Sequence, residues 1–125
     1  MRFSIAGAAA FCALTTGVHV VAGGPEVNAV VQASDLAPPL RAILGVIWHA
    51  VTVVLLVATF ILAVASRRPL PSAEVAIAAI FLGWAVLFVF YGVTMLGTLL
   101  IMPQWIVFLL IPALISAGWI WEREG

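Results

Sequence analysis

Four long apolar runs alternate with short polar segments along this chain. A helix rises about 1.5 Å per residue, so about 20 residues cross the roughly 30 Å hydrocarbon layer of a bilayer. Each run is long enough to do so. The pattern therefore predicts a compact all-α integral membrane bundle of four transmembrane helices, over residues 4–23, 41–66, 73–96 and 103–121.

The segments between the runs carry turn and breaker signals. Residues 23–25 read Gly-Gly-Pro and should end the first helix, leaving residues 24–40 as an exposed connection with a short amphipathic turn. In the second link, Ser72 is placed to cap the third helix. A third link is centred on residues 97–98, and Pro103 suits the first turn of the fourth helix.

The first apolar run also has features of a signal peptide. It follows the basic residue Arg2, and residues 20–22 read Val-Val-Ala, a tolerable cleavage site. The apolar region is longer than the usual 7 to 15 residues, and two threonines at 15–16 interrupt it. We therefore expect this run to be retained as the first transmembrane helix.

The arginines predict the orientation of the four helices. Arg2, Arg67, Arg68 and Arg123 fall on one side of the membrane, and only Arg41 falls on the other. Basic residues favour the cytoplasmic side, so both termini are predicted to be cytoplasmic. The polar connection after the first helix then faces outward.

Composition supports a membrane protein and excludes other classes. The chain is 66% hydrophobic and 8% charged, whereas soluble domains carry about 25% charged residues. Its net charge is zero and it has no lysine, so no basic surface for nucleic acid is expected. The single Cys12 is expected to be a small buried residue. Without repeats or linkers, residues 1–125 should form one domain.

Polar residues on the first two helices predict a pocket in the outer half of the bundle. Thr16 and His19 share a face of the first helix, and His49 and Thr52 share a face of the second. An ionisable side chain inside a membrane usually faces a cavity, a partner or a ligand. The predicted pocket residues, with Glu26 as a group at its mouth, are Thr16, His19, His49, Thr52, Tyr91 and Gln104.

Two histidines on neighbouring helices allow several chemistries. His19 and His49 could ligate a b-type haem, or could bind a transition metal together with Glu26. A glycine four residues before a histidine, as in Gly45 and His49, also occurs at chlorophyll-binding positions. The structural alternative is that each neutral imidazole hydrogen-bonds a neighbouring helix and fixes its register.

Near the predicted cytoplasmic boundary, Trp119 and Trp121 are expected to anchor the fourth helix at the interface. Glu74 is expected at the end of the third helix on the same side, not inside the membrane. A small multidrug exporter, which uses an embedded carboxylate, is therefore disfavoured.

No phosphate-binding, nucleophile-elbow or HExxH motif is present, so no catalytic role is assigned. The favoured hypothesis is a multi-pass inner-membrane accessory or assembly subunit, surrounded by lipid and docked on other membrane subunits or on a second copy. The alternatives are a haem- or metal-binding redox protein and, with less support, a small-solute transporter.

Overall fold

The computed structural model describes the backbone of residues 1–124 and the side chains of residues 1–121, and this backbone is helical without strands. Four helical runs are long and apolar enough to cross a membrane, at Phe3–Gln32, Pro38–Ala65, Pro71–Leu96 and Gln104–Trp121. The predicted all-helical architecture is confirmed. The elements are α1 (Phe3–Val21), η1 (Gly24–Asn28), α2 (Ala29–Gln32), α3 (Pro38–Ala65), α4 (Pro71–Tyr91), η2 (Gly92–Leu96) and α5 (Gln104–Glu124).

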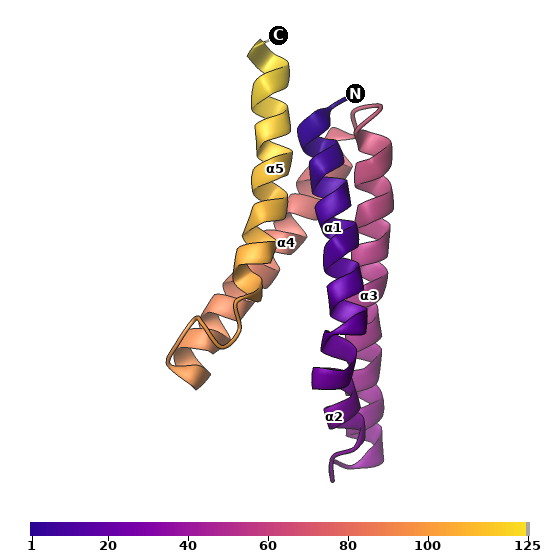
Figure 1. The fold of residues 1–125 in the computed structure, drawn as a ribbon, viewed down its shortest axis with the longest axis vertical. Helices are drawn as coiled ribbons and strands as arrows, with labels where there is room; N and C mark the ends of the chain where they lie inside the picture. Colours follow the sequence, from indigo (N-terminus) through magenta and orange to yellow (C-terminus); the bar gives the residue numbers. More distant parts are fainter. Residues whose placement is uncertain (125) are drawn as a thin grey trace.

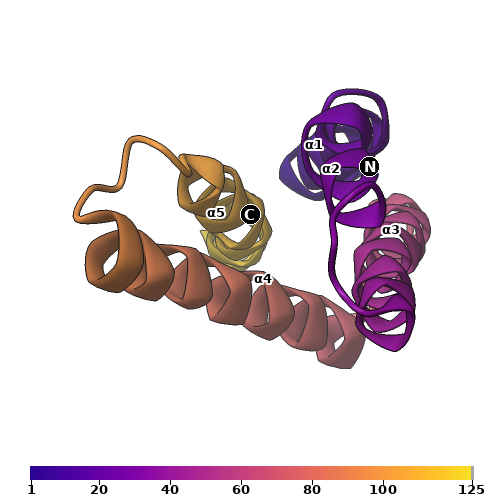
Figure 2. The ribbon, with the colours of Figure 1, turned by 90° about the horizontal axis from the view of Figure 1, so that it is seen from below.

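The helices form two antiparallel hairpins (Figure 1). α1 packs along α3, and α4 packs along α5. The two hairpins meet at the end of the molecule that carries both termini, where α1 contacts α5 and α3 leads into α4. From there α4 slants away from α3, as the view along the long axis shows (Figure 2). The two hairpins therefore diverge toward the other end of the molecule. The sequence had predicted a compact bundle along the whole length of the four helices.

The buried core lies where the hairpins meet. It is built from the first half of α1, the second half of α3, the first two thirds of α4 and the middle of α5. Cys12 is fully buried there, as predicted, and its Sγ lies 3.5 Å from Leu55 O. The fully buried apolar side chains are Ile5, Ala8, Cys12, Leu55, Leu62, Ala65, Phe81, Ile111 and Ile115.

A glycine brings α5 close to α1. A Cβ atom built on Gly118 would lie 2.9 Å from Ile5 Cδ1 and 3.0 Å from Ser4 Oγ. Real Cβ atoms do not approach other heavy atoms this closely, so a larger residue at Gly118 would force the side chains of Ile5 and Ser4, or α5 itself, to shift. The close contact between α1 and α5 therefore depends on the absence of a side chain at Gly118.

The predicted break after the first helix does not end the helical run. Ala29 N donates to Gly24 O, five residues earlier, so η1 is a turn of π-helix that leads directly into α2. A wider turn of this kind carries the chain past Pro25, which has no N–H to continue the usual ladder. The exposed connection predicted over 24–40 is thus limited to residues 33–37, and α3 begins at Pro38 instead of residue 41.

The other two links are close to the predicted positions. Pro69 and Pro71 flank Leu70, and a residue before proline is held away from the helical region, so α4 starts in a new direction. Leu70 is the N-cap residue and has no side-chain cap, so the predicted cap at Ser72 is wrong. After η2, Gly97 has φ 64°, a left-handed conformation that favours glycine.

Candidate functional site

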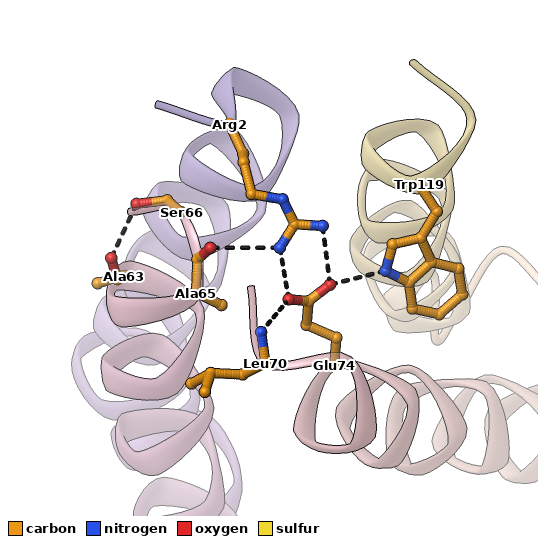
Figure 3. Close-up of polar contacts among 7 residues, drawn as sticks. All are labelled: Arg2, Ala63, Ala65, Ser66, Leu70, Glu74 and Trp119. Atoms are coloured by element: carbon orange, nitrogen blue, oxygen red, sulfur yellow. Dashed lines mark hydrogen bonds and ion pairs between the residues drawn. The ribbon is translucent and has the colours of Figure 1, made fainter. Parts of the chain in front are cut away.

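A buried cluster of polar side chains joins the two hairpins (Figure 3). It consists of Arg2 just before α1, Glu74 in the first turn of α4, and Trp119 near the end of α5; we call these three side chains the clasp. Glu74 is 0% exposed, and the Arg2 side chain is 11% exposed. Residues from opposite ends of the sequence therefore meet around one carboxylate.

The carboxylate of Glu74 is fully occupied by donors. Arg2 Nη1 lies 2.5 Å from Oε1 and Nη2 lies 3.1 Å from Oε2, a two-pronged ion pair. Trp119 Nε1 donates to Oε2 at 2.6 Å, and the backbone N–H of Leu70 donates to Oε1 at 3.0 Å. A carboxylate has about four lone-pair sites, so these four hydrogen bonds use its whole accepting capacity.

Arg2 also secures the end of α3. Its backbone N–H donates to Ser66 O at 2.8 Å, and its Nη1 donates to Ala65 O at 3.2 Å. The last carbonyls of a helix have no partner within the helix. Arg2 supplies partners for two of them while pairing with Glu74, so it ties α1, α3 and α4 together.

This arrangement is suited to holding helices and not to acid–base chemistry. Removing two charges from water is costly, and the cost is offset only when geometry is good and every polar atom is paired. Both conditions hold around Glu74. A carboxylate that is shielded from water and saturated with donors has no free lone pair with which to take a proton from a substrate. The clasp is therefore a connector between hairpins.

The clasp was not predicted from the sequence. Glu74 was expected at the end of the third helix and does lie in the first turn of α4, but the burial of its carboxylate against Arg2 and Trp119 was not expected. Trp119 was expected to anchor the fourth helix at the interface, and the structure shows that its indole N–H also donates to Glu74. One feature of the sequence could have pointed to the clasp. Glu74 is the only acidic residue within the four predicted apolar runs, so it needed a partner there.

Replacing the indole of Trp119 tests the third member of the clasp. Trp119→Phe keeps an aromatic ring but removes the donor to Glu74, so the free energy of unfolding should fall by about 1.5–3 kcal/mol, the range for a hydrogen bond to a charged group. The measurement is SDS titration in mild detergent followed by circular dichroism. Trp121→Phe is the matched control, because Trp121 is 65% exposed. Equal losses in the two variants would contradict the assignment.

The predicted polar residues of the first two helical runs lie within the α1–α3 hairpin. The His19 ring stacks on the ring of Trp48, with centroids 4.0 Å apart, and its Nε2 lies 3.3 Å from Trp48 O. Trp48 in turn lies over Gly23, where a Cβ would approach the indole to 2.9 Å. His19 thus contacts the residue next to His49 and holds the register of α1 against α3.

The other residues of this hairpin make local contacts. Thr16 is buried, and its Oγ1 donates to Cys12 O at 2.9 Å, one turn earlier in α1. The Oγ1 of Thr52 lies 3.5 Å from Trp48 O, and His49 is on an exposed face of α3. Hydroxyls that bond back to their own helix are satisfied without a ligand.

Tyr91 and Gln104 lie on the other hairpin. Both are exposed, and Tyr91 sits at the end of α4 with its ring against that of Phe90. α4 makes no close backbone approach to α1, and the two hairpins diverge toward this end (Figure 1). The structure therefore does not bring Tyr91 and Gln104 together with His19 and His49 in one pocket.

The predicted metal ligands are not gathered either. Glu26 is exposed on η1. Within the part of the chain that the structure describes, no three His, Cys, Asp or Glu side chains are placed to hold a metal ion. Haem ligation by His19 and His49 stays a prediction, and for His19 it requires release of the contact with Trp48.

Comparisons with protein-family models, with curated proteins and with solved structures found no match to this chain.

Proposed function

We propose that this chain is a small multi-pass subunit of a bacterial-type inner membrane, with both termini in the cytoplasm, whose diverging hairpins dock on the transmembrane helices of a larger complex. Four helical runs of sufficient length and apolarity support membrane insertion. The distribution of arginines supports the orientation. In this orientation the clasp lies at the cytoplasmic end and the open end faces outward.

The observation that carries this proposal is the groove between α3 and the first half of α4. It has a volume of about 300 Å³, and apolar side chains from both hairpins line it, including Val57, Ile61, Ile77 and Ile80. Alanines at 58, 73 and 76 also line it. Small residues let helix backbones approach closely, and such residues are enriched where helices associate in lipid. A groove with small and branched apolar residues on two walls suits a partner helix.

The clasp explains how the groove is kept open. In lipid, apolar side chains gain little by leaving the acyl chains for a neighbouring helix, because both are equally apolar. Apolar contacts alone would therefore not fix the position of one helix against the next, and the groove could close. The Arg2–Glu74 pair and Gly118 instead fix α1, α4 and α5 at one end. Ala73 and Ala76 line the groove beside Glu74, and Arg2 joins Glu74 to the end of α3. The clasp therefore fixes the two walls of the groove relative to each other before a partner arrives.

Site-specific photocrosslinking in cells tests the proposal. A photoreactive residue is placed in the groove at Val57 or Ile80, and at the exposed control positions Val46 on α3 and Val86 on α4. We expect a crosslinked band of fixed size from the groove positions, which mass spectrometry identifies as one membrane protein. The control positions should give lipid adducts without that band. The same bands at all four positions, or none at any, would refute docking in the groove.

A further inference from the structure

The carboxyl end of α3 carries a second concave surface. Two arginines, Arg67 and Arg68, border it together with apolar side chains of the last two turns, Phe60, Ala63 and Val64. Its volume is about 440 Å³. This surface combines two cationic side chains with an apolar wall, and we call it the arginine site.

Arginine side chains at the carboxyl end of a helix often donate hydrogen bonds to its last carbonyl groups. In α3 these carbonyl groups already accept hydrogen bonds from other donors. Val64 O accepts the backbone N–H groups of Arg67 and Arg68, and Ala63 O accepts the Ser66 hydroxyl. Ala65 O and Ser66 O are taken by Arg2. The clasp thus frees the two guanidinium groups from a capping role.

Among the described side chains, the acidic one at this end of the molecule, Glu74, is also occupied. Among the side chains of residues 1–121, the single ion pair is Arg2–Glu74, and the Glu74 carboxylate has no remaining lone pair for another donor. Glu26 and Asp35 lie near the opposite end of α3. Arg67 and Arg68 are both exposed, so a positive charge of two faces outward from the helix end.

We propose that the arginine site binds an anionic phospholipid. The two guanidinium groups hold the headgroup phosphate, for which the planar fork of arginine is well matched, and one acyl chain lies along Phe60 and Val64. A lipid with net negative charge is favoured over a zwitterionic one, because two cations face a single phosphate. The proposal rests on α3 spanning a membrane, as proposed above, but not on a partner protein.

Native mass spectrometry of the purified full chain tests this site. The chain is reconstituted in nanodiscs with equal amounts of phosphatidylglycerol and phosphatidylcholine of matched acyl chains, and the lipids retained after release are counted. We expect phosphatidylglycerol to be enriched about 30-fold, the order expected from two arginines near a lipid surface. The enrichment should fall to about onefold in Arg67→Gln/Arg68→Gln. It should persist in Arg41→Gln, since Arg41 donates to Gln32 O at the other end of α3.

Other outcomes refute the site and are distinguishable from each other. Equal retention of the two lipids, or enrichment that survives the double substitution, would overturn the proposal while leaving membrane insertion intact. If inorganic phosphate displaces phosphatidylglycerol from the unmodified chain, the site recognises free phosphate and the lipid assignment is wrong. A chain that does not enter the nanodiscs would refute both this inference and the proposed membrane function.

Discussion

Glu74→Ala should lower the free energy of unfolding by about 3–5 kcal/mol, the range measured when one member of a buried ion pair is removed. The substitution removes the buried carboxylate that accepts hydrogen bonds from the Arg2 guanidinium and the Trp119 N–H. Because these contacts join α1, α4 and α5, the two hairpins should also separate. SDS titration gives the energy, and spin labels at positions 46 and 86 in a Cys12→Ala background give the separation.

A double substitution distinguishes a lost pair from general damage to the fold. Arg2→Met/Glu74→Met removes both charges, so no uncompensated charge is buried, and replacing a whole pair by apolar residues is far less costly than breaking it. We expect this variant to be more stable than Glu74→Ala. Val75→Ala serves as a control beside it, since Val75 is exposed. If the double variant loses as much stability as Glu74→Ala, the ion pair is not the source of the effect.

Gly118→Leu should lower the free energy of unfolding by about 1–3 kcal/mol, as found for overpacked cores. Even a Cβ would meet Ile5 Cδ1 at 2.9 Å, and a leucine side chain would push α5 away from α1. The displacement would also move Trp119 from Glu74. The same SDS titration measures the loss.

Gly83→Leu is the matched control, because a Cβ at Gly83 meets no atom within 4 Å. Leucine has a higher helix propensity than glycine by up to about 1 kcal/mol, so this variant should be as stable as the original chain or more stable. Ile5→Ala should restore part of the stability of Gly118→Leu. Similar losses at the two glycines would show that the close approach of α1 and α5 does not limit stability.

The long apolar runs made the four helices predictable. Their length and lack of charge exclude other elements. The carboxyl end of α3, both ends of the α4–η2 run and both ends of α5 lie within a few residues of the predicted positions. The error at residues 23–25 has a local cause. A Gly-Gly-Pro sequence usually ends a helix, but a π-turn can absorb a proline when the chain on both sides is otherwise helical.

The candidate sites were harder to predict than the helices. Periodicity placed Thr16 and His19 on one face of the first helix, because residues three and four apart share a face. In the structure Thr16 is buried and His19 contacts Trp48 of α3. It could not show that Tyr91 and Gln104 belong to a hairpin that turns away. That direction is set by Pro69 and Pro71 and by the contacts of α4 with α5, which are not encoded in the pattern of any single helix.

The sequence by itself determined that this chain forms four apolar helices, because hydrophobic length and scarcity of charge act locally along each segment. Only the tertiary structure decided which polar residues meet. Arg2 and Trp119 lie near opposite ends of the chain and Glu74 lies between them in sequence, and their pairing follows from how the hairpins cross at one end. Burial of a charge depends on everything packed around it, so no stretch of sequence could specify the clasp alone.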